Sequence, residues 1–329
     1  MISFVIVNYN SKELTSTAIL SIDRSIVSTP YEIIIVDNCS TDGSRDMFEA
    51  LARERGNLVY IYCDHNHGFG RANNIGAEVA RGEYLVLINP DTEIPSLGFD
   101  EFISGCLLAN VGVVAPAVVY GNGAIQANGG GYSTIFTFIF QNLRLGYYSR
   151  KLGLVKTFSK AVNFLPFLRN TTVGKYLGNF QAQSPMISKY DWVSGSCMIM
   201  QKSVFSRVGG FDDGYFMYVE DEDLCRRVAE LGLEIRVDRR FTIVHTEGGT
   251  QKKKSIKLGV AQRARHFSNL RYLAKFYGNL SSWVLRAYYV LAFSIGGVGY
   301  LVKLQPSSAV DRFGFALTFL FPRRTRAFQ

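Results

Sequence analysis

Short apolar runs alternate with amphipathic stretches over the first 118 residues of the chain. The apolar runs have the length and composition of buried strands, and they lie at Ile2–Val7, Glu32–Val36, Leu58–Tyr62, Glu83–Ile88 and Val111–Val118. Helical patterns lie between them, at about residues 12–27, 43–55, 69–80 and 98–109. Continuous apolar strands that alternate with helices predict an α/β fold, in which helices cover both faces of a parallel sheet.

This alternation stops after residue 118, where a Gly-rich turn leads into a stretch rich in aromatic and basic residues. Three later runs are predicted to be strands, at Trp192–Gln201, Glu234–Val237 and Phe241–His245. From Ile256 onward the pattern is helical. We therefore expect an α/β domain over residues 1–250, with a basic, aromatic insert at 124–190, followed by a helical region over residues 251–329.

Two apolar runs near the C-terminus predict contact with a membrane. The uninterrupted stretch Ala287–Val302 has 16 residues, fewer than the roughly 20 that a spanning helix needs. A second run, Phe313–Phe321, is followed by basic residues. We expect both to be interfacial or shallowly inserted helices whose Arg and Lys side chains reach the headgroups, with a true span over residues 283–304 as the alternative. The N-terminal stretch MISFVIVNYNS lacks the basic region of a secretory signal.

The formal net charge of +9 conceals a partition along the chain. Residues 1–131 and 191–250 together carry 14 basic and 26 acidic side chains, whereas residues 132–190 carry 8 basic side chains and no acidic ones. Residues 251–329 carry 14 basic side chains and a single acid, Asp311. Because these basic residues alternate with Phe, Leu and Tyr, we expect them to face anionic membrane lipid and not nucleic acid.

The five cysteines are scattered without a CxxC pair, so neither a zinc site nor a disulfide framework is indicated. Four of them lie inside apolar or helical patterns, which fits buried thiols in a reducing cytosol. Together with the basic, apolar C-terminal region, this predicts a protein at the cytoplasmic face of the cell membrane, either peripheral or shallowly inserted.

The segment GGFDDGYFMYVEDEDLCRR, residues 209–227, contains four consecutive acids from Glu220 to Asp223. A helical pattern follows, with Leu224, Val228 and Leu231 at spacings of four and three. Acids in the first turn of a helix accept backbone N–H bonds and interact favourably with the helix dipole, so capping is one interpretation. Four acids exceed what capping needs, however, and a carboxylate held at a cleft wall by the preceding apolar residues is a candidate general base.

Polar loops follow four of the predicted strands, as NYNS (8–11), DNCSTDGS (37–44), DHNHGFG (64–70) and NPDTE (89–93). Ligands of parallel sheets bind at such loops. Asp91 is a candidate ligand for Mg²⁺ or Mn²⁺, and the alternative is a plain turn. Asp37 suits contacts to a nucleotide base or ribose, and the alternative is an Asx-type turn before the next helix. His245 is either a structural histidine or, if the chain folds it beside Asp91, the residue that completes a metal site.

Seven motifs in order resemble those of the family 2 inverting glycosyltransferases with the GT-A fold: VIVNYNS, VDNCSTDGS, NHGFGRANNIGA, LINPDTE, WVSGSCMIM, GGFDDGYFMYVEDEDLCRR and IVHTEGG. The resemblance covers roughly residues 1–250 and is greatest to the rhamnosyltransferase-like branch, where NPD replaces the DxD found elsewhere. It implies a Rossmann-like mixed sheet that binds a nucleotide-diphospho-sugar. The helical, membrane-associating extension follows that sheet.

The resemblance also implies a role for each candidate residue. Asp221 would be the general base, with Glu220 beside it in the site and Asp223 as a supporting or capping group. Asp91 and His245 would hold a divalent metal, Mg²⁺ or Mn²⁺. The sugar and acceptor pocket would be formed by Trp192, Gly195 and Ser196. The donor would contact residues from all four polar loops and the helix after the third, namely Asn8, Tyr9, Asn10, Asp37, Asn66, Gly68, Asn74, Asn89 and Asp91.

The implied reaction is inverting transfer of a sugar from a nucleotide-diphosphate donor to a glycan or polyprenyl-diphosphate-linked acceptor, in cell-surface polysaccharide synthesis. The expected donor is dTDP-rhamnose, with a UDP-hexose or GDP-mannose as alternatives. A non-catalytic, membrane-bound scaffold of the same fold is a second interpretation, which the joint presence of Asp37, Asp91, Asp221 and His245 disfavours. A nucleotidyltransferase would need a Gly- and Lys-rich phosphate loop after the first strand, whereas VNYNSKE contains no glycine.

Overall fold

The structure is a computed structural model that describes residues 1–143, 185–246, 259–302 and 304–320. These residues form two compact units. The α/β unit comprises residues 1–132, 185–213 and 220–246, and the helical unit comprises the remaining described residues. Most of the predicted basic insert, residues 144–184, lies outside the described residues.

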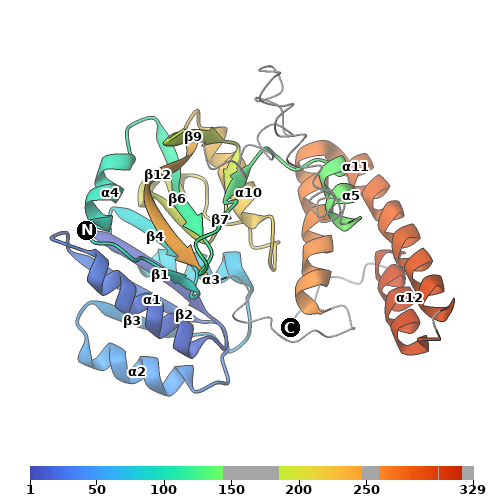
Figure 1. The fold of residues 1–329 in the computed structure, drawn as a ribbon, viewed down its shortest axis with the longest axis horizontal. Helices are drawn as coiled ribbons and strands as arrows, with labels where there is room; N and C mark the ends of the chain where they lie inside the picture. The colour runs from blue at the N-terminus through green and yellow to red at the C-terminus, as the bar shows by residue number, and fades with distance from the viewer. Residues whose placement is uncertain (144–184, 247–258, 303, 321–329) are drawn as a thin grey trace. The chain divides into compact units, whose positions relative to one another are not determined.

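A ten-stranded mixed sheet forms the centre of the α/β unit (Figure 1). Its main path runs β3-β2-β1-β4-β11-β6-β12-β5, with β7 beside β6 and β9 beside β12. The strands are β1 (Ile2–Asn8), β2 (Tyr31–Asp37), β3 (Leu58–Tyr62), β4 (Tyr84–Ile88), β5 (Thr92–Glu93), β6 (Val111–Val119), β7 (Ile125–Gln126), β9 (Ile187–Tyr190), β11 (Cys197–Gln201) and β12 (Glu234–His245). Two short strands, β8 (Gly129–Gly130) and β10 (Trp192–Val193), pair separately.

Helices cover both faces of this sheet. Successive residues of a strand point to opposite faces, so each strand contributes to two cores. Phe4 and Ile6 of β1 belong to a core shared with α1 (Lys12–Ser25), α2 (Ser44–Glu54) and α4 (Phe99–Cys106). Val5 and Val7 belong to a second core, shared with α3 (Phe69–Val79), α9 (Lys202–Arg207) and α10 (Glu220–Ala229). Burial on both sides explains the continuous apolar runs in the sequence, and the predicted α/β layering is confirmed.

Strand direction brings the site-bearing ends of the strands to one edge of the sheet. β1 runs parallel to β2 and β4, and β2 runs parallel to β3. β11 is antiparallel to both β4 and β6, so β6 and its parallel neighbour β12 run in the same direction as β4. The loops after β1, β2, β3, β4 and β12, together with the loop before β11, therefore meet at the same edge, where ligands of such sheets bind.

Two strand predictions are wrong in detail. The run Trp192–Gln201 is two strands, β10 and β11, separated by a turn at residues 194–196. The predicted pair Glu234–Val237 and Phe241–His245 is the single strand β12, whose register against β6 shifts between Asp238 and Thr242. Asp238 lies opposite Pro116, which has no N–H to donate, so the ladder is interrupted there.

The helical unit contains α5 (Ile135–Asn142), α11 (Val260–Val302), α12 (Pro306–Leu320) and the extended segment Gly214–Val219. Gly278 lies inside α11 with φ 82° and ψ 164°, so α11 consists of two helices joined at a kink. α12 packs along α11 (Figure 1). The core between these elements is aromatic, and its fully buried rings include Tyr272, Tyr289, Phe315 and Phe319. The helical pattern predicted beyond residue 256 is confirmed for the described residues.

The segment Gly214–Val219 is held by the first half of α11. Ser268 Oγ donates to the carbonyl oxygen of Met217 at 2.8 Å, and the guanidinium of Arg265 lies 4.2 Å from the ring centroid of Tyr218. Tyr218 and Val219 both have φ of 71°, a left-handed conformation that side chains other than glycine rarely adopt. The chain continues from Val219 directly into α10 of the α/β unit.

The second half of α11 exposes an apolar face. Its members recur at helical spacing and are between 49% and 78% exposed: Val284, Leu291, Ile295, Val298 and Val302. By length and composition alone, α11 is the one helix among the described residues that could cross a membrane. Exposed apolar surface of this extent on a basic helical unit is typical of a membrane or protein contact.

Candidate active site

Asp37 is the centre of a buried hydrogen-bond network at the ends of β1, β2 and β3. Its carboxylate accepts bonds from the Ser40 backbone N–H at 2.8 Å, the Tyr60 hydroxyl at 2.9 Å and Asn8 Nδ2 at 3.3 Å. The side chain is 0% exposed. The bond to Ser40 closes the loop after β2 but spans one residue more than an Asx turn, and the N-cap of α2 is Gly43, not Ser40 or Asp42. In this structure Asp37 shapes the loop, and a direct contact with a nucleotide stays a prediction.

The loop after β1 presents two of the predicted donor contacts at the surface. Tyr9 is 44% exposed, so its ring is available to a ligand. Asn10 has φ of 51°, and its Oδ1 accepts a bond from the Thr41 backbone N–H at 2.8 Å. Asn8, in contrast, is fully buried, and its Oδ1 accepts a bond from Thr15 Oγ1 at 2.8 Å. Asn8 and Asn10 thus fix the loop that carries Tyr9.

Asn38 connects the loop after β2 to the loop after β3. Its Nδ2 donates to Asn66 Oδ1 at 2.8 Å and to the Gly68 carbonyl oxygen at 3.2 Å, while its Oδ1 accepts from the His67 backbone N–H at 2.8 Å. Gly68 begins α3 with φ of 82°, which only glycine adopts without strain. The predicted donor residues Asn66 and Gly68 therefore belong to one rigid loop.

Asn74 joins α3 to the segment before α10. Its side-chain amide donates to the Phe211 carbonyl oxygen and to Asp213 Oδ1, both at 2.9 Å, and its Oδ1 accepts from the Phe211 backbone N–H at 2.9 Å. These bonds occupy both ends of the amide and tie α3 to the segment that precedes α10. The donor contact predicted for Asn74 gains no support from this geometry, because the side chain is already engaged in joining two parts of the α/β unit.

His245 and Asp91 lie side by side, as the metal-site interpretation requires. His245 Nε2 is 3.1 Å from Asp91 Oδ1, and the ring is 8% exposed. On the other side of the ring, His245 Nδ1 is 3.0 Å from Gln126 Oε1. If Nδ1–H donates to Gln126, Nε2 carries a lone pair that points at a carboxylate oxygen, an arrangement that needs a cation or a proton between them.

The separation of these two atoms fits two ligands of one divalent ion. Ligands at about 2.1 Å from a common ion and at right angles to each other lie about 3.0 Å apart, and the observed distance is 3.1 Å. Asn89 Nδ2 lies 3.4 Å from the same His245 nitrogen, and the Asn89 backbone N–H donates to the Ser196 carbonyl oxygen at 3.0 Å. A bound metal at this edge of the sheet would supply positive charge next to the Asn89 and Ser196 backbone.

Asp221 is held against the turn between β10 and β11. Its Oδ2 accepts a bond from the Gly195 backbone N–H at 3.0 Å, and its Oδ1 accepts from the Glu222 backbone N–H at 2.9 Å. Burial raises the pKa of Asp221 above its usual range, although the two N–H donors oppose that rise. A carboxyl group whose pKa is moved toward neutrality is suited to accept a proton.

Gly195 permits this contact. A Cβ at Gly195 would lie 3.1 Å from the Phe69 ring, which would have to shift, and at an ordinary contact distance of 3.9 Å from Asp221 Cβ. Trp192, in the same segment, donates from Nε1 to the Gly131 carbonyl oxygen at 3.0 Å and is half-buried. The residues Trp192, Gly195 and Ser196 thus lie in one short segment that contacts Asp221 through Gly195, and the pocket expected there stays a prediction.

The other acids of the run have separate positions. Asp223 is fully buried and pairs with Arg227 Nε at 2.6 Å, one helical turn later, which agrees with the supporting position expected for it. Glu220 is 5% exposed at the start of α10. Its catalytic role stays a prediction. The capping interpretation of the acidic run accounts for the helix start, but it does not account for the bond between Asp221 and Gly195.

The comparisons with known proteins identify two glycosyltransferase domains in the chain. Residues 3–154, which contain Asp37 and Asp91, match glycosyl transferase family 2. Residues 179–246, which contain Asp221 and His245, match the N-terminal domain of galactosyltransferase. The chain therefore contains a glycosyl transferase family 2 domain over residues 3–154, as predicted, and it is a transferase.

Two curated relatives are rhamnosyltransferases. The chain is 27% identical to rhamnosyltransferase WbbL of Escherichia coli (strain K12) over 227 residues, which cover 65% of this chain and 72% of the relative. It is 25% identical to the N-acetylglucosaminyl-diphospho-decaprenol L-rhamnosyltransferase of Mycobacterium tuberculosis (strain ATCC 25618 / H37Rv) over 270 residues, which cover 74% of this chain and 75% of the relative.

Two solved glycosyltransferases share the fold of this family 2 enzyme. The mannosyltransferase PcManGT from Pyrobaculum calidifontis, solved with GDP-Man and Mn²⁺, has a TM-score of 0.54 at 14% identity, and the likeness covers 98% of this chain and 88% of that one. GalNAc-T7, solved with UDP, GalNAc and Mn²⁺, has a TM-score of 0.57 at 14% identity, over 98% of this chain and 58% of that one. The predicted GT-A fold class is confirmed.

Sequence reasoning missed three residues that organise the site. Gln126 orients His245, Tyr60 donates to Asp37, and Asn38 joins two loops. Gln126 lies on a two-residue strand in the Gly-rich turn, where no periodicity marks it. Tyr60 lies within a predicted strand and Asn38 within one of the seven motifs, but Tyr60 bonds another strand and Asn38 bonds another loop.

Proposed function

We propose that this glycosyltransferase moves rhamnose from dTDP-rhamnose to a glycan or polyprenyl-diphosphate-linked acceptor, with inversion at the anomeric carbon, in cell-surface polysaccharide synthesis. The bond from the Gly195 backbone to Asp221 carries the proposal, because it orients a half-buried carboxylate of raised pKa beside the turn between β10 and β11. The two rhamnosyltransferase relatives support the donor, and the mycobacterial relative, named for a diphospho-decaprenol substrate, supports a lipid-linked acceptor.

Asp221 acts as the general base in this mechanism. As the acceptor hydroxyl oxygen bonds to the anomeric carbon, its proton passes to Asp221, and the bond from that carbon to the diphosphate oxygen breaks on the opposite face. The nucleoside diphosphate leaves, and the configuration is inverted. Gly195 and Glu222 hold the two carboxylate oxygens through backbone N–H bonds, so the base is oriented before the acceptor arrives.

Asp91 and His245 would hold Mg²⁺ or Mn²⁺, which when bound offsets the charge that develops on the leaving diphosphate. Gln126 keeps the His245 ring in place through Nδ1. Tyr9, exposed directly after β1, would contact the nucleotide, while Asp37 and Asn38 hold the surrounding loops. The same residues would serve a UDP-hexose or GDP-mannose, which is why the donor has to be determined by experiment.

The helical unit would bring the enzyme to the cytoplasmic face of the membrane, where a lipid-linked acceptor is found. The exposed apolar face of α11 supplies hydrophobic contact, and basic side chains such as Arg286 and Arg312 each add about 1 kcal/mol of attraction near an anionic surface. The unit also has a pocket of about 760 Å³, whose lining includes Phe293, Tyr300 and Arg312. Aromatic walls with a guanidinium group suit an amphiphile with an anionic headgroup.

The test is release of nucleoside diphosphate by the detergent-purified full chain, given Mn²⁺ or Mg²⁺, a panel of nucleotide-sugars and a membrane-lipid extract. We expect release from dTDP-rhamnose, abolished by EDTA and lowered by about 10²–10⁴-fold in Asp221→Asn. Release from another donor, with the same dependence on Asp221, would reassign the sugar but keep the mechanism. If the chain binds a donor but releases no nucleoside diphosphate with any acceptor extract, the scaffold interpretation is favoured.

A further inference from the structure

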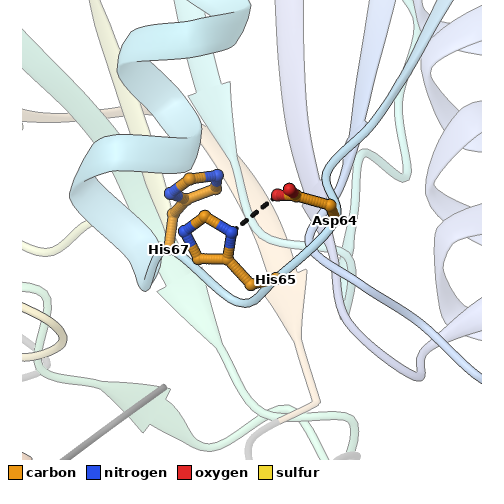
Figure 2. A group of neighbouring side chains, drawn as sticks. All are labelled: Asp64, His65 and His67. Atoms are coloured by element: carbon orange, nitrogen blue, oxygen red, sulfur yellow. Dashed lines mark hydrogen bonds and ion pairs between the residues drawn. The ribbon is translucent and has the colours of Figure 1, made fainter. Parts of the chain in front are cut away.

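Asp64, His65 and His67 form a cluster in the loop after β3 (Figure 2). His65 Nδ1 lies 2.6 Å from Asp64 Oδ1, and the two imidazole rings are 3.9 Å apart between centroids, at an angle of 52°. One metal-ligating atom from each side chain lies within 4.8 Å of the others. Among the described residues, this is the one group of three such side chains that could share an ion.

The backbone of this loop is fixed from both sides. The Cys63 N–H donates to the Asp37 carbonyl oxygen at 2.8 Å, and the His67 N–H donates to Asn38 Oδ1 at 2.8 Å. Between them, the carbonyl oxygen of Asp64 is 3.4 Å from Cys39 Sγ. The positions from which the three side chains extend are therefore set before any ion binds, which lowers the entropic cost of binding.

The side chains themselves keep enough freedom to close on an ion. Asp64 is exposed, and both histidines are half-buried. Ligands at about 2.0–2.2 Å from a tetrahedral ion lie about 3.4 Å apart, so the 4.8 Å span needs only rotation of the Asp64 and His65 side chains. Figure 2 shows the two rings side by side with Asp64 facing His65.

The donor set differs in chemistry from that of a magnesium site. Two imidazole nitrogens and one carboxylate suit borderline ions such as Zn²⁺ and Co²⁺, whereas Mg²⁺ prefers oxygen. Three protein ligands in an exposed loop leave a coordination position open. None of these three side chains has a role in the transfer mechanism, so the cluster has no explanation in the proposed chemistry.

We propose that Asp64, His65 and His67 form a binding site for a Zn²⁺-class ion, separate from the Asp91 and His245 pair. Because Asn66 lies between the two histidines, an ion bound here restrains the loop that carries Asn66 and Gly68. The binding of the ion is argued from the cluster alone. An effect of the restrained loop on the affinity for the sugar donor rests in addition on the proposed function.

The experiment is a competition titration of Zn²⁺ against a chromogenic chelator, using the full-length chain in excess Mg²⁺. The chain has four histidines, two of them outside the cluster, so variants can separate the sites. We expect His65→Gln and His67→Gln each to weaken Zn²⁺ binding about ten-fold or more. His245→Gln and the exposed control Asp46→Asn should leave this binding unchanged.

Co²⁺ provides a second readout, since a His-ligated ion has visible absorption bands that His67→Gln should remove. Equal melting temperatures would show that these substitutions leave the fold intact. Zn²⁺ affinity that is unchanged in both His65→Gln and His67→Gln overturns the proposal, and so does binding that is lost in His245→Gln or in Cys39→Ser instead. Donor release is not needed for any of these outcomes, so failure here is distinguishable from failure of the proposed function.

Discussion

Asp100, which is buried, and Asp221, which is half-buried, are two carboxylates that accept backbone N–H bonds at opposite edges of the sheet. Asp100, on α4, accepts from Val27, Ser28 and Thr29 at 2.9–3.1 Å. Burial opposes its ionisation, but the three donors outweigh burial and hold the pKa of Asp100 below its usual range. Asp221 accepts two such bonds, and burial prevails, so its pKa is raised. The same residue type is a structural anchor in one place and a candidate base in the other.

The difference lies in which protonation state the fold stabilises. The Asp100 site stabilises the carboxylate, so it contributes stability above the unfolded pKa of about 3.9 and loses it as pH falls through the lower folded value. The Asp221 site disfavours the carboxylate, so above its raised folded pKa the ionised group reduces the stability of the protein. A carboxylate that is present although its ionised form lowers the stability of the fold is expected to have a function.

Replacing Asp221 by Asn should have the largest effect on activity and no harmful effect on stability. We expect turnover to fall by about 10²–10⁴-fold, because the base is lost while an oxygen remains to accept the Gly195 bond. The melting temperature at pH 7 should be equal or higher, and that advantage should disappear near pH 4. Wild-type turnover should fall as pH decreases through the raised pKa. A large loss of melting temperature in Asp221→Asn would show instead that the carboxylate is structural.

Replacing Asp100 by Asn should give the opposite result. An amide cannot reproduce the charged bonds to three N–H groups, and we expect the free energy of unfolding to fall by about 2–3 kcal/mol at pH 7. Turnover per folded molecule should be unchanged. Urea unfolding at pH 7 and pH 3 measures the effect, which should shrink at the lower pH, with exposed Glu101→Gln as the control. An equal loss at both pH values would contradict the role given to the charge.

Gln126→Leu tests the geometry of the predicted metal site at Asp91 and His245. Without the bond to Nδ1, the His245 ring loses its orientation, and we expect the Mn²⁺ concentration for half-maximal turnover to rise about 10–100-fold. Gln126→Glu keeps an acceptor at the same place and should have a smaller effect. An unchanged Mn²⁺ dependence in Gln126→Leu would remove Gln126 from the site.

Asn74→Leu should have the smallest effect on catalysis. The substitution removes the bonds to Phe211 and Asp213, and we expect the free energy of unfolding to fall by about 1–3 kcal/mol while the KM for the donor stays the same. Thermal unfolding and donor titration distinguish the two roles. A raised KM with unchanged stability would restore the donor contact that the motif predicted.

The sequence predicted what depends on periodicity and on strand ends. Apolar runs located the main strands, and four of the five cysteines are buried as expected. The pairing of Asp91 with His245 could be anticipated because both follow strands whose ends lie at one edge. The partners that come from irregular segments could not be anticipated. Gln126 and the turn around Gly195 are positioned by packing between distant parts of the chain, for which the local pattern holds no signal.

The left-handed pair Tyr218 and Val219 has an energetic consequence for the residues that follow it. A non-glycine residue in this region costs of the order of 1–3 kcal/mol, and more so when it is β-branched like Val219. The enzyme therefore carries stored conformational energy two residues before Asp221, balanced by the contacts of Met217 and Tyr218 with α11. We expect Val219→Gly to release that energy and to widen the range of orientations open to Asp221, so that the melting temperature rises while turnover falls.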